Sequence, residues 1–170
     1  MLLTDESWTL AESEEFDIDR LMSWFTDANS IRRWGGPEFR FPCNRHSFAE
    51  DMHWGRMASF SLRSPGIELA AFGQLYLRLG CINLARIAVQ PELRGQGVGK
   101  RLVGMLMSIG ARLFQSDTFS LFVYRDNKPA YACYESMGFV AARYPDNVPL
   151  ADVCDYLTRP VNLLERTYAP

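Results

Sequence analysis

The sequence predicts an α/β (α+β) fold in which helices flank a central sheet. Residues 58–90 hold three β-type segments, and the Pro-Gly turn at 65–66 makes the first two an antiparallel hairpin. The apolar residues of 98–115 recur at helical spacing, and an apolar strand segment, 118–124, follows them. Because strand–helix–strand crossovers are right-handed in nearly all proteins, residues 81–124 are expected to form a right-handed unit.

The other elements follow from the same periodicities. The N-terminal part is predicted to form an amphipathic helix over 14–28, a loop over 29–42 and a short helix over 46–57, with Ser47 and Glu50 as a capping box. The remaining prediction, in chain order, is strands 58–64, 67–80 and 81–90, helix 98–115, strand 118–124, helix 128–137 ended by Gly138, and strands 139–143 and 152–160. With no linker and no internal repeat, residues 1–170 are expected to form a single domain.

The composition is that of an ordinary globular protein and argues against several classes of function. At 170 residues with a net charge of -2, the chain is long enough for one core and has no overall attraction to nucleic acid. Its four cysteines form no Cys-x-x-Cys pair, and His46 and His53 lie seven residues apart, so no metal site is predicted. The start of the chain lacks the pattern of a signal peptide, and no apolar run approaches the roughly 18 residues of a membrane span. We therefore expect a cytoplasmic protein with free thiols and no membrane partner.

A glycine-rich stretch, VQPELRGQGVGKRL at 89–102, follows a strand and opens a helix, a setting in which backbone N–H groups bind anions. It is not the P-loop of nucleotide-binding proteins, because Arg94 stands where that motif has its first glycine and Arg101 where it has Ser or Thr. It is not a dinucleotide fingerprint either, because Lys100 and Leu102 stand where the two possible registers need the last glycine. What remains is RGQGVG, an Arg/Gln-x-x-Gly-x-Gly/Ala pattern.

This pattern resembles the pyrophosphate loop of the GNAT family of N-acetyltransferases, which use acetyl-CoA. A second signature of that family is matched by NKPAYACYESMGF at 127–139, which has the family's residues at the family's spacing: Asn127, Ala130, Tyr134, Gly138 and Phe139. One helix and one strand separate the two motifs, as in the family, and the resemblance covers roughly residues 57–144. It implies the GNAT fold, a mixed and mostly antiparallel sheet of about six to seven strands flanked by helices, and an acetyl-CoA-dependent N-acetyltransferase.

The resemblance assigns acetyl-CoA, as a cosubstrate and without a metal, to residues 81–144. The glycines let the pyrophosphate approach the loop amides, and Arg94 adds a charged donor. The pantetheine arm is expected to pair with the exposed backbone of strand 81–90 as an added strand would, with Ile87 and Val89 on one face and Arg86 opposite. The predicted CoA-binding residues are Ile87, Ala88, Val89, Arg94, Gly95, Gln96, Gly97, Val98, Gly99, Lys100 and Asn127, the last of which also caps a helix.

Tyr134 is the predicted catalytic residue, since by resemblance its hydroxyl donates a proton to the departing CoA sulfur. Tyr131 lies one helical turn earlier and stays open as a rival. The strands that carry a glutamate base in many relatives have no carboxylate here. A water held by the backbone, or an acid of the N-terminal part, is left as the general base: Glu38, Glu50 or Asp51.

The acceptor amine, a small molecule or a peptide, is expected to contact the helices and loop of residues 16–57. Arginines of this part outnumber its one loop glutamate and favour an acceptor with acidic groups, although a solvated loop is an equal explanation: Arg32, Arg33, Arg40 and Arg45 against Glu38. Two other functions stay open, an acyl-CoA-binding module without turnover and a transferase of another acyl group such as succinyl. A homodimer through exposed aromatic residues near the C-terminal strand also stays open.

Overall fold

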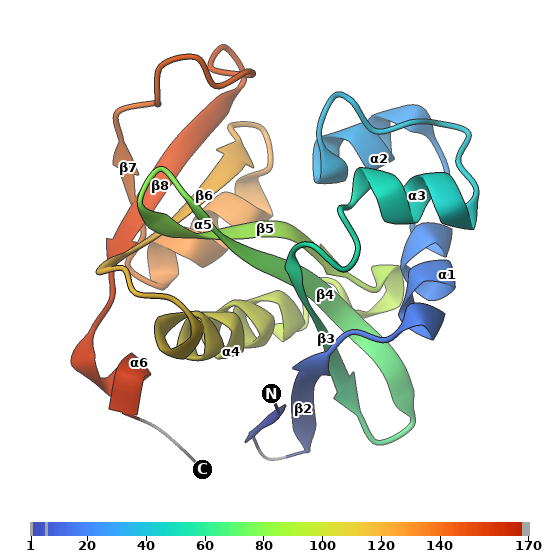
Figure 1. The fold of residues 1–170 in the computed structure, drawn as a ribbon, viewed down its shortest axis with the longest axis horizontal. Helices are drawn as coiled ribbons and strands as arrows, with labels where there is room; N and C mark the ends of the chain where they lie inside the picture. Colours follow the sequence, from blue (N-terminus) through green and yellow to red (C-terminus); the bar gives the residue numbers. More distant parts are fainter. Residues whose placement is uncertain (1, 6, 168–170) are drawn as a thin grey trace.

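The computed structural model describes residues 2–5 and 7–167, which form one mixed sheet with helices on both of its faces (Figure 1). In chain order the elements are β1 (Leu2–Asp5), β2 (Trp8–Glu12), α1 (Glu15–Ser23), α2 (Ala28–Gly35), α3 (Arg45–Asp51), β3 (Ala58–Ser64), β4 (Ile67–Arg78), β5 (Cys81–Val89), a 3-10 turn (Pro91–Leu93), α4 (Val98–Leu113), β6 (Thr118–Tyr124), α5 (Lys128–Ser136), β7 (Val140–Ala142), β8 (Cys154–Pro160) and α6 (Leu163–Thr167). Within this described part of the chain, no helix combines the length and the apolar character that crossing a membrane requires.

The described sheet has eight strands, in the order β1-β2-β3-β4-β5-β6-β8-β7. Neighbouring strands are antiparallel except β5 and β6, which run parallel on either side of the α4 connection. This confirms the predicted α/β (α+β) class, the β3–β4 hairpin and the mostly antiparallel sheet. The sheet is larger than expected because β1 and β2, which are too short to give a clear sequence pattern, extend it beyond β3.

The segment predicted as a loop over 29–42 instead begins with a helix, α2. Its N-cap is Asp27, whose side chain accepts a hydrogen bond from Ser30 N–H at 2.8 Å. The fully buried Ile31 anchors the helix in the core, and Gly36, with a φ of 115°, ends it. The glycine pair therefore terminates a short helix, and the prediction of a loop was wrong for this half of the segment.

The capping box of α3 also differs from its prediction. The helix begins at Arg45, so that Asn44 is the N-cap and Ser47 is the residue that completes the box. The Asn44 side chain accepts from Ser47 N–H at 2.9 Å, and the Ser47 hydroxyl accepts from Asn44 N–H at 3.1 Å. Glu50 takes no part in it, because asparagine is as good a helix cap as serine and stands one turn earlier.

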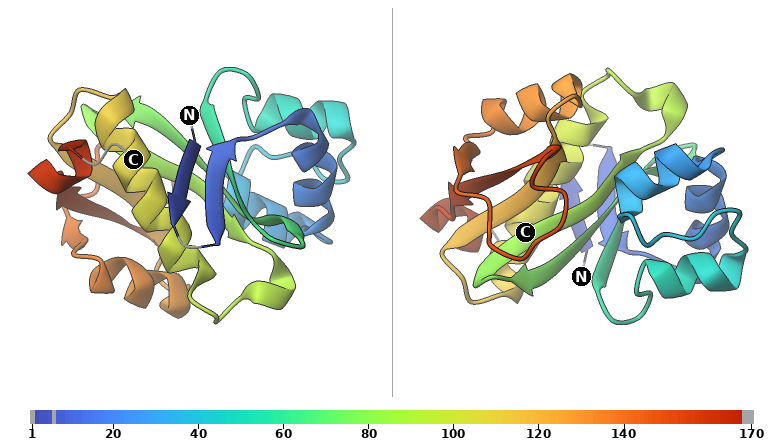
Figure 2. Two further views of the ribbon diagram at one scale, coloured as in Figure 1. Left: turned by 90° about the horizontal axis from the view of Figure 1, so that it is seen from below. Right: turned by 90° about the horizontal axis from the view of Figure 1, so that it is seen from above.

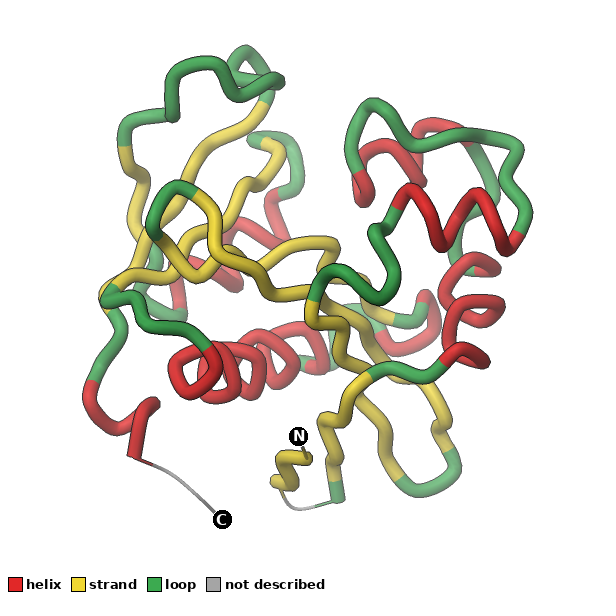
Figure 3. The backbone as a smooth tube through the Cα atoms, in the orientation of Figure 1, coloured by secondary structure: helices red, strands yellow, loops and turns green. Residues whose placement is uncertain are grey.

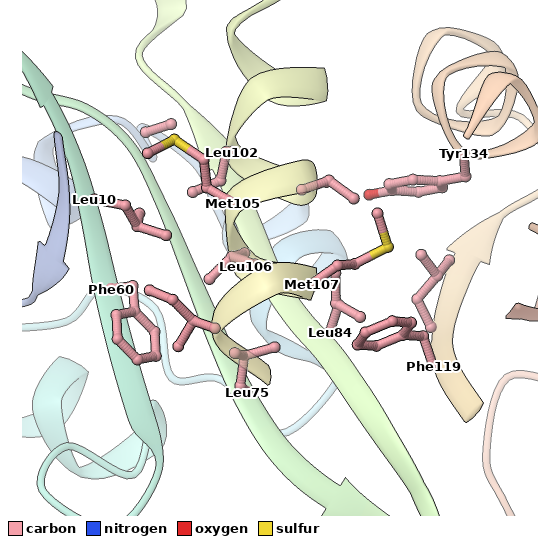
Figure 4. Close-up of a cluster of buried hydrophobic side chains, with 14 of the residues drawn as sticks. Leu10, Phe60, Leu75, Leu84, Leu102, Met105, Leu106, Met107, Phe119 and Tyr134 are labelled. Carbon is pink, nitrogen blue, oxygen red and sulfur yellow. The ribbon is translucent and has the colours of Figure 1, made fainter. Parts of the chain in front are cut away.

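Two hydrophobic clusters lie on opposite faces of the sheet. The larger cluster packs α4 and α5 against the strands, and Figure 4 shows its centre, where Leu106 of α4 lies among Leu75, Leu84 and Phe119. The smaller cluster packs α1, α2 and α3 against β4 and β5 and is rich in aromatic rings: Phe25, Trp34, Phe39, Phe48 and Phe72. Figure 2 shows α4 across one face in its left view and the three N-terminal helices gathered on the other in its right view. The sheet thus separates α4 from the helices predicted to receive the acceptor.

We refer to the face of β4, β5 and β6 that carries α1, α2 and α3 as the acceptor-side face. The connection between β7 and β8, residues 143–153, is a loop. Figure 3 draws it in green, across from α2 and α3. The candidate site lies along β5 and β6.

Candidate active site

The strands β5 and β6 pair only near their beginnings and then diverge. Their register contains two pairs, Ile82 with Phe119 and Asn83 with Ser120. Beyond these, residues 84–89 of β5 and residues of β6 line a cleft of about 1190 Å³, whose other walls are the glycine loop, α5 and part of α2. Pockets for small ligands have volumes of about 300–1,000 Å³, so this cleft is large enough to hold one. The cleft lies where the sequence predicts the pantetheine arm.

A β-bulge at Arg86 determines which side chains of β5 face each side of the sheet. The register with β4 shifts there, so that Gly73 stands opposite both Arg86 and Ile87, and Arg86 has a φ of 49°. Leu84 before the bulge and Ile87 and Val89 after it all pack in the cluster with α4. The extra residue shifts the alternation by one and turns the Arg86 side chain to the acceptor-side face. The predicted faces of Ile87, Val89 and Arg86 are confirmed, but the bulge that produces them was not predicted.

At Val89, the backbone N–H and C=O of β5 face the cleft rather than β4. Gln90 N–H donates to the Ala70 carbonyl at 2.9 Å, and because successive residues direct their N–H and C=O to opposite edges of a strand, those of Val89 face away from β4. The Val89 carbonyl accepts a hydrogen bond from Arg94 Nε at 3.2 Å. Arg94 is therefore folded against the end of β5, beside the glycine loop.

The glycine loop forms a tight turn at the start of α4. Gly95 and Gly97 have φ values of 74° and 81°, a conformation that favours glycine, and Gly97 is the N-cap of the helix. The first backbone bond of the helix runs from Arg101 N–H to the Gly97 carbonyl at 3.1 Å. The N–H groups just before Arg101 lie in the first turn of this 16-residue helix, where they have no partner within the helix and form the positive end of its dipole.

Some residues of the glycine loop line the cleft, and others point away from it. Lining residues of the loop and first turn are Arg94, Gly95, Gly97, Gly99 and Lys100. Gln96 turns back, its Nε2 donating to the Glu92 carbonyl at 2.9 Å, and Val98 packs in the α4 core. Gln96 and Val98 therefore offer their backbone N–H groups rather than their side chains.

The two tyrosines of α5 lie on different faces of the helix. Tyr134 lines the cleft, and Figure 4 shows its ring pointing from α5 toward α4, beside Met107. Burial raises the pKa of the Tyr134 hydroxyl well above its ordinary value of 10, so the group stays protonated at neutral pH. Tyr131 points to β8, where its hydroxyl donates to Asp155 Oδ2 at 3.2 Å, and it is not part of the cleft lining. Of the two, Tyr134 is thus the tyrosine that lines the cleft.

Asn127 and Gly138 mark the two ends of α5. The Asn127 side chain accepts a hydrogen bond from Ala130 N–H at 3.4 Å and also lines the cleft. Gly138 follows the helix with a φ of 87°. Their predicted roles as helix cap and helix end are confirmed, and contact of Asn127 with CoA stays a prediction.

The acids considered as general base lie outside the cleft lining. Glu50 and Asp51 both pair with Arg40, whose Nη2 lies 2.8 Å from Glu50 Oε2 and 2.7 Å from Asp51 Oδ1. Glu38 is exposed on the loop after α2. The carboxylate that does line the cleft, among the described residues, is Asp27, which the sequence analysis did not select. A hydrogen bond from Ser30 N–H holds the pKa of Asp27 below its ordinary value, so this helix cap is a weak proton acceptor.

Comparison with known proteins identifies the family. The model of the acetyltransferase (GNAT) family matches residues 28–139, a segment that contains the cleft-lining part of α2, the glycine loop and α5. The chain belongs to the GNAT family. Its sheet and flanking helices are accordingly the GNAT fold.

Two solved GNAT structures share this fold. Ribosomal-protein-S18-alanine N-acetyltransferase from Escherichia coli superposes with a TM-score of 0.62 at 24% identity, over 96% of this chain and 99% of that one. Spermidine N-acetyltransferase from Vibrio cholerae, in complex with CoA and spermine, superposes with a TM-score of 0.71 at 16% identity, over 92% and 97%. By sequence, mycothiol acetyltransferase from Corynebacterium urealyticum is 28% identical over an alignment of 155 positions that covers 81% of this chain and 40% of that protein. The chain thus spans less than half the length of this relative.

The structure adds residues to the GNAT cleft that the sequence analysis did not select. They come from the α1–α2 region, from the end of β6 and from α5: Trp24, Phe25, Asp27, Trp34, Tyr124 and Cys133. The aromatic members were visible in the sequence as parts of a helix and a loop. No local pattern shows that they face β5, because that contact depends on how the N-terminal helices pack on the sheet.

Proposed function

We propose that this GNAT protein is an N-acetyltransferase that transfers the acetyl group of acetyl-CoA to a primary amine. The observation that carries the proposal is that the glycine loop, the backbone of β5 at Val89 and the side chain of Tyr134 line one cleft. An anion-binding turn, an open strand edge and a protonated acid are the three features that binding and cleaving a CoA thioester require.

The loop and β5 are proposed to bind acetyl-CoA. The pyrophosphate would accept hydrogen bonds from N–H groups of residues 95–100, with Arg94 and Lys100 as neighbouring cations. The pantetheine arm would lie along β5 at Ile87, Ala88 and Val89, in the space left where β6 diverges. Asn127, at the opposite wall of the cleft, is proposed as a further contact.

Tyr134 is proposed as the general acid. The neutral amine forms a C–N bond to the acetyl carbon while the C–S bond breaks and its electron pair stays on sulfur. Tyr134 donates the proton that sulfur takes up, and the proton lost by the amine nitrogen passes through water to restore the tyrosine. A positioned acid of this kind contributes about 10²–10⁴-fold to the rate. Water is proposed as the relay because the acids considered from sequence lie outside the lining.

We further propose that residues 1–170 work as a single GNAT domain with two functional parts. Residues 81–144 would bind acetyl-CoA, and residues 16–57 would contact the acceptor. The support for the second part is that α2 contributes Arg33 and Trp34 to the wall of the same cleft.

The experiment is to follow release of the CoA thiol while acetyl-CoA is offered with a panel of amines that includes amino acids, peptides, polyamines and aminoglycosides. We expect release that depends on both the amine and acetyl-CoA. The cleft without a glutamate base favours one second candidate, an acyl-CoA-binding module without turnover. Tight binding of acetyl-CoA in calorimetry together with no amine-dependent release would support that module, and release with succinyl-CoA alone would replace the acetyl donor.

A further inference from the structure

The arginines that suggested an acidic acceptor in the sequence are engaged within the protein. Each has a partner that the chain itself supplies: Arg32 donates to the Phe39 carbonyl, Arg33 pairs with Asp126, Arg40 with Glu50 and Asp51, and Arg45 with Glu15 and Asp19. Three of these four side chains are thus neutralised by carboxylates. They do not form a free cationic surface for an acceptor.

Arg86, which was not among those four, is in a different situation. It stands at the β-bulge of β5, lines the cleft and is largely buried on the acceptor-side face. Its Nη1 donates to Gln74 Oε1 at 2.8 Å and contacts Met57 Sδ at 3.2 Å, and its Nη2 donates to the Asp51 main-chain carbonyl at 3.3 Å. All three acceptors are neutral groups, an amide oxygen, a thioether sulfur and a main-chain carbonyl. The Asp51 carboxylate itself pairs with Arg40.

A buried guanidinium without a carboxylate is costly for the folded protein. Burial lowers the pKa of Arg86, which expresses the cost of keeping its charge away from water. Buried charges in proteins are normally paired, because a nearby opposite charge offsets the lost hydration. The bulge, with its positive φ at Arg86, holds the residue in this position, and no carboxylate of the described residues forms an ion pair with it. The Asp51 carboxylate acts on Arg86 only through its charge and is itself paired with Arg40.

Two buried N–H donors at this place have no acceptor in the described structure, Arg86 Nε and Trp34 Nε1. Both residues line the cleft and both lie beside Phe39: the Arg86 Cζ is 5.8 Å from the centre of that ring, and the Trp34 ring centre is 5.5 Å from it. Unsatisfied buried donors are rare in folded proteins, so two of them on residues of one wall of the cleft, one of them on a guanidinium without a carboxylate partner, are an unusual feature of this wall.

The charges of the residues that line the cleft also favour an anionic ligand. Among the described residues, its basic members are Arg33, Arg86, Arg94 and Lys100, and its one carboxylate is Asp27. Arg94 and Lys100 stand at the glycine loop, where phosphate groups are expected, and Arg33 has Asp126. Arg86 alone is left without an anion.

We propose that Arg86 and Trp34 form an anion subsite for the acceptor, so that the acceptor is an amine that also carries a carboxylate. The inference rests on the proposed function and gives it a substrate class. A carboxylate supplies the negative charge that the Arg86 guanidinium lacks, and its oxygens accept charge-assisted hydrogen bonds. Arg86 adjoins Ile87, along which the pantetheine would lie, so the carboxylate and the reacting nitrogen must be close together in the acceptor. An α-amino acid, free or at the end of a short molecule, fits this arrangement, and a polyamine does not.

The test compares each amino acid with the amine that lacks only its carboxylate: phenylalanine with phenethylamine, lysine with cadaverine, and ornithine with putrescine. In the wild-type protein we expect kcat/KM to favour the acid of a pair by at least about tenfold. Arg86→Gln should reduce this ratio to about one, Arg86→Lys should restore part of it, and Trp34→Phe, which keeps an aromatic ring but loses the indole Nε1–H, should reduce it with the fold intact. Arg143→Gln, the same charge change at an exposed pair outside the cleft lining and outside residues 16–57, is the matched control and should keep the wild-type ratio.

The outcomes separate this inference from the proposed function. If the amines are acetylated as well as their acids, or if Arg86→Gln and Trp34→Phe keep the wild-type ratio while remaining folded by circular dichroism, the anion subsite is wrong and the acetyltransferase stands. If no amine in the panel is acetylated, the proposed function fails, and the subsite is then tested by calorimetry of the CoA-saturated protein with N-acetylphenylalanine and N-acetylphenethylamine. Preferential binding of the first compound that Arg86→Gln removes would support the subsite, and equal or absent binding of the two would overturn it.

Discussion

Arg33 of α2 and Asp126, which lies between β6 and α5, form an ion pair with two hydrogen bonds that joins two walls of the cleft. Nη2 of Arg33 lies 2.5 Å from Asp126 Oδ1, and Nη1 lies 3.2 Å from Oδ2. The same guanidinium stacks on the Tyr124 ring at 4.3 Å from its centre. The hydrogen bond from Arg33 holds the pKa of Asp126 below its ordinary value, so the pair stays ionised at neutral pH. It connects the acceptor-side helices to the proposed CoA-binding core.

Breaking this pair is expected to change acceptor binding more than stability. In Arg33→Gln, the KM for the acceptor should rise several-fold while the melting temperature stays close to that of the wild type, because the pair is exposed and exposed pairs stabilise little. Steady-state kinetics and thermal unfolding measure the two effects. Arg143→Gln breaks another exposed pair, with Asp146, and serves as the control that should leave both unchanged. An unaltered KM in Arg33→Gln would show that the pair does not position α2 for the acceptor.

Tyr134→Phe should lower kcat by about 10²–10⁴-fold, because it removes the proton donor and keeps the buried ring. The Kd for acetyl-CoA, measured by calorimetry, should stay within about twofold of the wild-type value, since the hydroxyl acts on the leaving sulfur rather than on binding. Tyr131→Phe is the matched control one helical turn away. Its hydroxyl bonds to Asp155 outside the cleft lining, so its kcat should remain that of the wild type. The reverse result would assign the acid to Tyr131.

The raised pKa of Tyr134 predicts how activity and stability depend on pH. Because the folded hydroxyl ionises only well above pH 10, kcat should show no alkaline loss from this residue between pH 7 and about 10. In the unfolded chain the same tyrosine ionises near pH 10, so above that pH the folded state binds more protons than the unfolded state and the free energy of unfolding falls as pH rises. Urea unfolding at pH values from about 9 to 11 should show a shallower fall in Tyr134→Phe than in the wild type. Equal slopes in the two proteins would mean that the hydroxyl is not buried.

Gly97→Glu should weaken acetyl-CoA binding by more than about tenfold, because it places a carboxylate where the helix dipole attracts the pyrophosphate. The substitution also forces a side chain into a backbone with a φ of 81°, which costs about 1–2 kcal/mol of stability.

Gly66→Glu separates these two effects. Gly66 has a φ of 80° in the turn between β3 and β4, and, as at Gly97, no atom lies within 4 Å of an added Cβ. The control should therefore lose similar stability and keep its affinity for acetyl-CoA in calorimetry. Equal affinity in both variants would contradict the assignment of the glycine loop.

The two parts of the cleft were not equally predictable. The loop at residues 94–99 and the helix that follows it are encoded by contiguous residues, since glycines permit the turn and apolar spacing sets the helix, and both occur as predicted. The helix α2 was missed because its short pattern resembles a loop until Ile31 is buried against the sheet. The capping box of α3 was shifted because two polar residues three positions apart, Asn44 and Ser47, are both suitable N-caps, and the helix begins after the first of them.

By itself, the sequence determined the order of strands and helices from β3 to β8, the glycine loop, the second family signature at α5 and, through these two motifs, the resemblance to the family. These are local properties, set by residues a few positions apart. The tertiary structure alone decided that Arg86 sits in a bulge facing the acceptor side, that Arg33 is engaged by Asp126, and that Tyr134 rather than Tyr131 faces the cleft. Each of these depends on contacts between residues distant in the chain, such as the 93 positions between Arg33 and Asp126, and such contacts leave no pattern in any short stretch of residues.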